Sequence, residues 1–469
     1  MKSLLHFLLL LIAPFSLHCE HKITVIGTGY VGLVSGACLA EFGNDVICCD
    51  IDANKIRMLN NGEIPIYEPG LKELVQKNTQ IKFSSNVAEA IQKNDVILIC
   101  VGTPMAQTGE ADLTALYSAA KSIGENLNSP KTIYIKSTVP LGTIKKVKSE
   151  IGKHNKKDTP FSIAYLPEFL REGSAVQDFL HPDRVVIGAE SDEIQNQVLE
   201  ILQPLQQQNV PFQFTKIESA EAIKLVANSF LAVKISFINE IANLCDQTGA
   251  DIFEVAQGIG SDSRIGRKCL NPGPGYGGSC FPKDIQAILN NAQDLGVELR
   301  VISAAAKANH DQPKVVIEKL KNTLQSPLKG KTIGILGLAF KANTDDVRDS
   351  PALKVMEQLL AMGAKIQAYD PEAMLNTKKL FPQVTYCYST YETAKKADAI
   401  LVLTEWEEFG RLNWVKIHQL MNHPNIVDAR NTLSVNNLTG LGFNLRNIGH
   451  CSTPAILKKI SQRNTKDSK

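Results

Sequence analysis

Residues 22–32, KITVIGTGYVG, join a short apolar run to three glycines with the spacing G-x-G-x-x-G. The apolar run predicts a buried strand, and the glycines predict a tight turn into a helix. Gly27 permits the turn, Gly29 lets the backbone approach a phosphate group, and Gly32 allows helix and strand to pack closely. This pattern restricts the segment to a strand–helix unit whose helix start can hold a pyrophosphate.

Asp50 ends the next predicted strand, 18 residues after Gly32. A carboxylate at this point accepts hydrogen bonds from ribose hydroxyls and repels a 2′-phosphate, which favours NAD over NADP. The alternative is a structural glycine turn without a ligand, and the complete strand–helix–strand context speaks against it. The sequence therefore predicts NAD as the cofactor.

The second half of the chain echoes the first. KTIGILGLA parallels KITVIGTG, and Gly337 corresponds to Gly27, whereas alanines stand opposite Gly29 and Gly32. Strands alternating with helices predict an α/β fold with two Rossmann-like, doubly wound parallel sheets. We expect the second copy not to fit a dinucleotide pyrophosphate.

A helical apolar pattern without proline runs over residues 219–250, between the two α/β units. Such a segment predicts a long central helix that joins the two sheet domains. Its apolar excess could pack against a second subunit, so we expect a homo-oligomer, a dimer first of all.

Composition excludes several classes of function. A chain of 469 residues is too long for a single hydrophobic core, so we expect two or three domains. A net charge of +2 gives no general attraction to nucleic acid. Ten cysteines show neither a CxxC pair nor the spacing of a metal site, so we expect no metal. Cysteines within apolar runs are typical of free thiols and favour a reducing compartment. These cysteines are Cys38, Cys48, Cys49 and Cys100.

The amino-terminal segment resembles an export signal, because Lys2 precedes an apolar run over 4–12. Residues 16–19 lack small side chains at the usual cleavage spacing, and the run is short of the ~20 residues of a membrane span. We expect a cytoplasmic protein whose residues 1–20 lie outside the folded core. An early start codon, a cleaved leader and a membrane tether remain open.

Three stretches each place two polar residues four positions apart, which on a helix puts both on one face. These pairs are Glu168 and Glu172 in PEFLREG, Lys224 and Asn228 in the long helix, and Cys280 and Asp284 in GGSCFPKD. Pro167 and Gly173 predict the start and end of a helix over PEFLREG. Taken singly, such residues are also common as core cysteines or solvated surface charges.

Cys280 follows two glycines and precedes a predicted helix start, where amide dipoles favour a thiolate. A thiolate can attack an aldehyde, and loss of hydride from the adduct gives a thioester that water hydrolyses. Lys224 and Asn228 could stabilise an oxyanion, and Asp284 could take a proton from a hydroxyl or from water.

The chain resembles the UDP-glucose/GDP-mannose dehydrogenase family over roughly residues 22 to 450, and seven motifs carry the resemblance. They are KITVIGTGYVGLVSGACLAEFG, VGTP, KSTVPLGT, PEFLREGSA, HPDRVVIG, PGPGYGGSCFPKD and FKANTDDVRDSPA. GYGGSCFPKD is highly specific, whereas the glycine fingerprint is common. The resemblance implies NAD-dependent oxidation of C6 of UDP-glucose in two steps to UDP-glucuronate, through a thiohemiacetal and a thioester on Cys280. The chain departs from the family pattern at Leu166, where asparagine is usual, and at 428–430, where DAR replaces the usual DGR.

The resemblance also implies the site residues. Those implied as catalytic are Cys280, Asp284, Lys224, Asn228, Glu168, Glu172 and Thr138. Glu168 is implied as the base for thioester hydrolysis, and Thr138 as the group that orients water. Those implied as cofactor contacts are Gly27, Gly29, Tyr30, Val31, Gly32, Asp50, Lys55, Thr103, Thr138, Glu172, Lys283 and Arg348. Those implied as sugar-nucleotide contacts are Glu168, Phe169, Leu170, Glu172, Lys224, Asn228, Arg264, Tyr276, Gly277, Phe340, Lys341 and Arg430, with Arg264 reaching the site from a neighbouring subunit.

The expected organisation has five parts. They are an apolar leader over 1–20, an NAD-binding domain over 21–210, a central helical dimerisation domain with Cys280 over 211–325, a UDP-sugar-binding domain over 326–455, and a polar tail over 456–469. GDP-mannose 6-dehydrogenase activity is the alternative within the family. A membrane-tethered sugar-nucleotide binder without activity is the alternative from another class, and the intact nucleophile argues against it.

Overall fold

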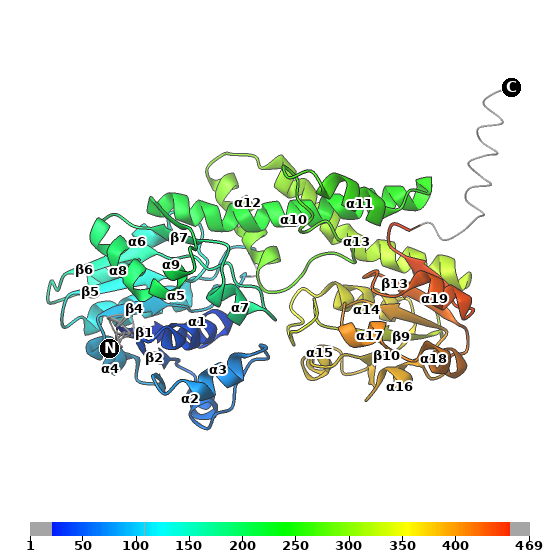
Figure 1. Cartoon of the computed structure of the whole chain (residues 1–469), viewed down its shortest axis with the longest axis horizontal. Helices are drawn as coiled ribbons and strands as arrows, with labels where there is room; N and C mark the ends of the chain where they lie inside the picture. Colours follow the sequence, from blue (N-terminus) through cyan, green and yellow to red (C-terminus); the bar gives the residue numbers. More distant parts are fainter. Residues whose placement is uncertain (1–20, 107, 451–469) are drawn as a thin grey trace, which may run out of the picture.

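The computed structural model describes residues 21–106 and 108–450 (Figure 1). The leader and the polar tail predicted from the sequence lie outside the described residues. The described chain forms two α/β domains, each built on its own sheet, and a long helix runs along both of them (Figure 1). The predicted fold class is confirmed.

The first sheet has the strand order β3-β2-β1-β4-β5-β6-β7-β8. Its strands are β1 (Lys22–Ile26), β2 (Asp45–Cys49), β3 (Ile81–Ser84), β4 (Val96–Ile99), β5 (Lys131–Ile135), β6 (Phe161–Tyr165), β7 (Val185–Gly188) and β8 (Phe212–Thr215). Strands β1 and β4, whose residues are buried apart from Lys22, lie in the middle, where helices cover both faces of a parallel sheet. The sheet extends through β8, past the expected domain boundary at residue 210.

One part of the sheet departs from the prediction of parallel strands. β7 pairs antiparallel with β6, and β8 runs parallel to β7. The pairing joins Tyr165, the last residue of β6, to Gly188, the last residue of β7. Helices α1 to α9 connect the strands of this domain. They are α1 (Tyr30–Glu41), α2 (Ala53–Asn60), α3 (Leu71–Lys77), α4 (Val87–Lys93), α5 (Thr114–Asn126), α6 (Thr143–His154), α7 (Ala175–Leu180), α8 (Asp192–Ile201) and α9 (Gln203–Gln207).

The predicted central helix is α10, Ile217–Thr248, and it ends at Gly249 in the left-handed conformation. Helices α11 (Ile252–Gly260), α12 (Phe281–Asp294) and α13 (Arg300–Leu324) follow it, and α10 packs against α12 and α13. By length and composition alone α10 could cross a membrane, although the same holds for core helices of soluble proteins. Its packing against two other helices is the arrangement of such a core helix.

The second sheet has the order β11-β10-β9-β12-β13-β14, with all strands parallel. Its elements are β9 (Thr332–Leu336), α14 (Pro351–Ala361), β10 (Lys365–Tyr369), α15 (Met374–Leu380), β11 (Thr385–Tyr386), α16 (Thr390–Ala394), β12 (Ala399–Val402), α17 (Glu407–Gly410), α18 (Trp414–Leu420), β13 (Asn425–Asp428), α19 (Val435–Gly440) and β14 (Asn444–Asn447). This order repeats that of β1 to β6, so the echo in the sequence reflects the same topology used twice.

The repeat extends to the turn after the first strand of each domain. Gly27 and Gly337 have φ values of 101° and 96°. Asp50 accepts a hydrogen bond from the backbone of the first turn, and Asp370 does the same in the second domain. Asp370 is fully buried and also accepts from Trp406 Nε1, so the second carboxylate is enclosed by its own domain.

The predicted helix over PEFLREG is wrong. Residues 166–171 form an irregular loop after β6, and a turn at Glu172 and Gly173 leads to α7. Tertiary contacts determine this path, because Glu68 accepts hydrogen bonds from the amides of Gly173 and Ala175. A side chain at Gly173 would also approach the Asn343 carbonyl oxygen to 2.5 Å, so this turn packs directly against the second domain.

Candidate active site

A cavity of about 880 Å³ extends from the loop after β6 to the residues just before α12. α10 contributes to its wall, and the second domain contributes Phe340 and Lys341. Of the residues predicted as catalytic, those lining it are Glu168, Glu172, Lys224, Asn228 and Cys280. The fold therefore gathers side chains from three separate parts of the sequence around one space.

Lys224 and Glu168 form a buried ion pair, with Nζ 3.1 Å from Oε1. Glu168 Oε2 accepts a hydrogen bond from the Leu170 amide at 2.6 Å. Burial opposes ionisation of Glu168, but Lys224, the Leu170 amide and Lys136 outweigh it and hold the pKa below its usual range. Burial likewise disfavours the Lys224 ammonium, yet Glu168 and Asp284 raise the Lys224 pKa. Both groups are therefore charged at neutral pH.

Asp284 lies in the first turn of α12 and is 1% exposed. Asn228 Nδ2 donates to its Oδ2 at 2.6 Å, and Lys283 Nζ donates to its Oδ1 at 2.5 Å. Lys224 and Asn228 lie four positions apart on α10, as the sequence spacing predicts. Each therefore holds one carboxylate from another part of the chain.

Cys280 is the N-cap residue of α12, which confirms the predicted helix start. Its Sγ lies 3.5 Å from Ser279 Oγ. Burial raises the pKa of the thiol, Glu168 raises it further, and Lys224 only partly offsets them. Burial therefore opposes the thiolate that the helix start was expected to favour.

Glu172 faces Cys280 from the loop after β6. Its Oε1 accepts a hydrogen bond from Ser279 Oγ at 2.7 Å and lies 3.5 Å from Arg348 Nη2. Its Oε2 accepts from Thr344 Oγ1 at 3.4 Å. Burial, followed by the nearby Asp346 carboxylate, raises the pKa of Glu172 to about 7.

The glycine turn fits a dinucleotide. A side chain at Gly29 would meet nothing within 4 Å, so the start of α1 is open to a ligand. A side chain at Gly32 would lie 1.9 Å from the Gly27 carbonyl oxygen, which requires glycine there. Asp50 Oδ2 accepts a hydrogen bond from the Thr28 amide at 2.9 Å. Burial alone would raise the pKa of Asp50, but backbone and side-chain hydrogen bonds outweigh it and hold the pKa below its usual range. An ionised carboxylate therefore stands beside the open turn.

Four other predicted cofactor residues lie at α1, at α2 and at the start of the second domain. Val31 is partly buried at the start of α1, and Lys55 Nζ lies 3.6 Å from Asp50. Arg348 binds Asp346 with two nitrogens. Tyr30 Oη donates to Asp345 Oδ1 at 3.0 Å, so α1 touches the second domain at its first residue.

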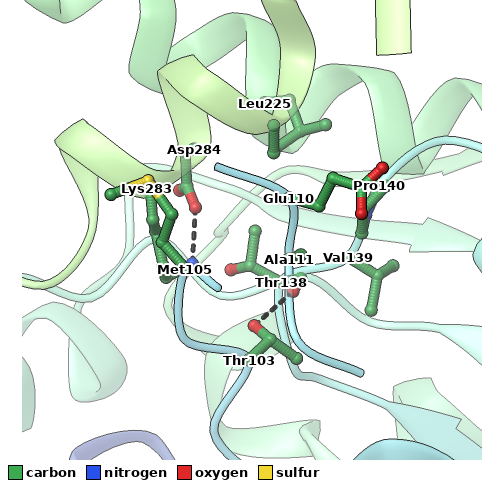
Figure 2. Close-up of a pocket in the computed structure, with 11 residues that line it drawn as sticks. Thr103, Met105, Glu110, Ala111, Thr138, Val139, Pro140, Leu225, Lys283 and Asp284 are labelled. Atoms are coloured by element: carbon green, nitrogen blue, oxygen red, sulfur yellow. Dashed lines mark hydrogen bonds and ion pairs between the residues drawn. The ribbon is translucent and has the colours of Figure 1, made fainter. Parts of the chain in front are cut away.

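A second, small cavity of about 10 Å³ separates the strand ends of the first domain from α12 (Figure 2). Thr103 Oγ1 donates to the Thr138 carbonyl at 2.7 Å on one side, and Lys283 and Asp284 lie on the other (Figure 2). Thr138 and Asp284 therefore line the same small cavity, whereas Thr138 does not line the large cavity that holds Cys280 and Glu168.

The predicted sugar-nucleotide residues divide into two groups. Those that line the large cavity are Glu168, Phe169, Leu170, Glu172, Lys224, Asn228, Gly277, Phe340 and Lys341. Tyr276 packs edge-on against Phe281, and Arg430 donates to the Phe340 carbonyl, so both brace the wall. Arg264 is exposed and pairs with Asp262, away from the cavity of its own chain.

Sequence reasoning did not single out three residues of the cavity. Lys136 is buried, lies near Glu168 and places Nζ 5.5 Å from the Phe179 ring centroid. Arg184 stacks on the Phe169 ring at 3.9 Å. Ser279 bridges Glu172 and Cys280. Two of these residues could have been found from the sequence, because Lys136 directly follows an apolar strand and Ser279 directly precedes the predicted nucleophile.

Family models cover nearly the whole described chain in three consecutive parts. The NAD-binding domain model of the UDP-glucose/GDP-mannose dehydrogenase family matches residues 21–206, the central domain model matches 218–311, and the UDP-binding domain model matches 334–435. The chain belongs to the UDP-glucose/GDP-mannose dehydrogenase family. The parts follow the three structural units described above.

Relatives within this family are similar over nearly their full length. UDP-glucose 6-dehydrogenase TuaD of Bacillus subtilis is 49% identical over 93% of this chain and 94% of its own. UDP-glucose 6-dehydrogenase of Rhizobium meliloti is 44% identical over 91% of this chain and 99% of its own.

Solved structures of family members have the same fold. UDP-glucose dehydrogenase of Pyrobaculum islandicum is 34% identical, with a TM-score of 0.84 over 90% of this chain and 96% of its own. UDP-D-ManNAc dehydrogenase of Pyrococcus horikoshii is 28% identical, with a TM-score of 0.80 over 92% of this chain and 100% of its own. The fold alone therefore does not select the sugar.

Among the described residues, no group of His, Cys, Asp and Glu could hold a metal ion. The eight cysteines within this part of the chain are free.

Proposed function

We propose that this protein is an NAD-dependent UDP-glucose 6-dehydrogenase that forms UDP-glucuronate. The observation that carries the proposal is one cavity lined by Cys280, by the Lys224–Glu168 ion pair and by Asn228, whose amide holds Asp284. A binding protein without activity needs no nucleophile there. The names of the relatives support UDP-glucose as the substrate.

In the first oxidation, a general base must take the proton of the C6 hydroxyl. Asp284 is suited to this role, because Asn228 and Lys283 hold its two oxygens in place. NAD, when bound at the glycine turn, accepts the hydride in each oxidation. The product of this step is the C6 aldehyde.

In the second oxidation, Cys280 Sγ bonds to the aldehyde carbon to give a thiohemiacetal. Lys224 and Asn228 stabilise its oxyanion, and hydride loss leaves a thioester. Glu168 then accepts a proton from water, which Thr138 orients, and hydrolysis frees the carboxylate and restores the Cys280 thiol. Four electrons leave the sugar in total, two in each oxidation.

The glycine turn and the wall of the large cavity are formed by separate sets of residues. We propose that Gly27, Gly29, Gly32 and Asp50 hold the dinucleotide and that Phe340 and Lys341 contact the sugar nucleotide. Asp50 is positioned beside Lys55 at the open turn, and Lys341 lines the large cavity. We also propose an NAD-binding domain that runs from residue 21 through β8, a central domain from α10 to about residue 325, and a UDP-sugar-binding domain that begins at about residue 326.

The decisive experiment supplies purified protein and NAD with UDP-glucose, GDP-mannose or UDP-N-acetylmannosamine and measures NADH and product. We expect two NADH for each UDP-glucose consumed and no comparable reaction with the other sugars. Preferred turnover of GDP-mannose would establish the alternative within the family. Sugar-nucleotide binding without NADH formation would establish the inactive binder.

We propose that the protein is a homodimer whose α10 helices face each other. Val226, Phe230, Phe237 and Leu244 on α10 are between 48% and 62% exposed, which is unusual for such side chains on one helix. Residues at these spacings lie near one face. A second copy would cover this face and could bring its Arg264 to the cavity.

We propose that the enzyme works in the cytoplasm and that residues 1–20 are not needed for folding. NAD and nucleotide sugars are cytosolic compounds, and Cys280 must stay reduced to act. Residues 22–26 already form the first strand. Deletion of residues 2–20 should leave soluble, active protein, and cell fractionation should find the activity of the native gene in the cytoplasm. Activity outside the cytoplasmic membrane would contradict the proposal.

A further inference from the structure

Three polar atoms lie in a row at the start of α12. Cys280 Sγ is 3.5 Å from Ser279 Oγ, and Ser279 Oγ is 2.7 Å from Glu172 Oε1. Ser279 and Cys280 are neighbours in sequence, whereas Glu172 comes from the loop after β6. The fold thus connects the thiol to a carboxylate through one hydroxyl.

The hydrogen bonds in this row have a defined direction. A serine hydroxyl has one proton and two acceptor lone pairs. The Glu172 oxygen receives the proton of Ser279, so the oxygen of Ser279 is free to accept the proton of the Cys280 thiol. Proton transfer from sulfur toward Glu172 follows the same direction.

The other two carboxylates near Cys280 are bonded to groups other than Ser279. Glu168 binds Lys224 and the Leu170 amide. Asp284 binds Asn228 and Lys283. Within residues 21–106 and 108–450, Ser279 is the hydrogen-bond partner found for Cys280 Sγ.

We propose that Ser279 is a positioning residue that relays the proton of the Cys280 thiol to Glu172. The S–H proton moves to Ser279 Oγ while the Ser279 proton moves to Glu172 Oε1. Sulfur keeps its electron pair as a thiolate, Ser279 remains a neutral hydroxyl, and Glu172 becomes a neutral acid. No oxidant or other reactant is needed.

The charges around the row fit this transfer. Cys280 faces Glu168 and Asp284, which raise the pKa of its thiol, and Lys224 and Lys283, which lower it. Burial raises the pKa of Glu172, Asp346 raises it further, and Arg348 lowers it. Tyr30 and Lys341 also face this carboxylate. With a pKa of about 7, Glu172 is ionised above neutral pH and is a better proton acceptor for a thiol than an ordinary carboxylate.

The inference rests on the proposed role of Cys280 as the nucleophile, but its test needs no turnover. The full-length protein, without cofactor or sugar, is alkylated with iodoacetamide between pH 5.5 and 9, because only the thiolate reacts readily. Trypsin is expected to release CLNPGPGYGGSCFPK, which contains both Cys269 and Cys280. Fragment-ion mass spectrometry therefore has to separate the rates of the two cysteines.

We expect the alkylation rate of Cys280 in the wild type to rise as pH passes through about 7, where Glu172 ionises. Ser279→Ala and Glu172→Gln should lose this rise, and at pH 7.5 their rates should be lower by about tenfold, the effect of one pKa unit on the thiolate fraction. Ser279→Thr keeps the hydroxyl and should restore the profile. Ser236→Ala, which removes a buried hydroxyl bonded to Ala305, is the matched control and should behave as the wild type.

If the pH dependence of Cys280 alkylation in Ser279→Ala coincides with that of the wild type, the relay is overturned. A Ser279→Thr protein with wild-type circular dichroism that alkylates as slowly as Ser279→Ala would also overturn it, since this would indicate a packing effect. If no sugar nucleotide leads to NADH, the proposed function is rejected. The alkylation profiles would still test the relay, because they are measured without cofactor or sugar.

Discussion

Lys224 Nζ lies 3.1 Å from Glu168 Oε1, and neither side chain is more than 4% exposed. The two residues are 56 positions apart, one on α10 and one on the loop after β6. A buried pair of this kind is costly to break, by about 3–5 kcal/mol, because the remaining charge has no partner. Each charge stabilises the other, so the pair keeps Lys224 and Glu168 in their charged forms beside Cys280.

Glu168→Gln should slow thioester hydrolysis more than sugar oxidation, because glutamine cannot accept a proton from water. A covalent sugar adduct should then accumulate on Cys280 and appear as added mass on the intact protein. Glu221→Gln is the control, since Glu221 is also buried but binds the amides of Gly142 and Ile144. Normal turnover of Glu168→Gln without an adduct would contradict the hydrolytic role.

Cys280→Ser should lower steady-state turnover by at least ~100-fold, on the scale of removing a positioned catalytic group. A serine hydroxyl remains protonated near neutral pH and does not readily form the adduct. Cys245→Ser, at a buried cysteine of α10 outside the cavity, should keep most of the activity. Near-normal double oxidation by Cys280→Ser would remove this residue from the mechanism.

Asp50→Ala should lower the preference for NAD over NADP by about tenfold, or about 1.4 kcal/mol. The change removes the charge that repels a 2′-phosphate, and it also frees the Thr28 amide that Asp50 holds. Binding of both cofactors is measured by titration, with Asp45→Ala at the other end of the same strand as control. An unchanged ratio would mean that Asp50 does not face the ribose.

Glu172 should make the protein less stable as pH rises from about 4.5 to about 7. Burial raises its pKa from 4.5 to about 7, so in this window the folded protein binds more protons than the unfolded chain. The stabilising contribution is present below 4.5 and is lost as pH rises through about 7, by about 3 kcal/mol in total. The thermal midpoint of the wild type should therefore fall relative to Glu172→Gln across this range, and parallel curves would contradict the shift.

Phe230→Asp should weaken the proposed dimer, because a charge would replace a ring that is 62% exposed in the single chain. Sedimentation velocity across a dilution series should show more monomer than for the wild type. Leu375→Asp is the control, as Leu375 is 77% exposed on α15 in the second domain. A monomeric wild-type protein would contradict the proposal at once.

Local pattern was sufficient for much of this fold. The apolar run before Gly27 gave a strand, the helical spacing over 219–250 gave α10, and the echo between the halves gave two sheets of one strand order. These features depend on periodicity and glycine conformation, which neighbouring residues determine. The pairing of Lys224 and Asn228 on one face of α10 follows in the same way.

Tertiary structure decided what depends on residues far apart in sequence. PEFLREG has the ends of a helix, but Glu68 and the second domain hold it as a loop, and this places Glu172 against Ser279. The helix start before Cys280 suggested a thiolate, yet burial raises its pKa. The sequence by itself determined which residue types and which sheets are present, because local periodicity encodes them. Only the folded chain determined burial and the contacts between distant segments, and these control the charge of each group in the cavity.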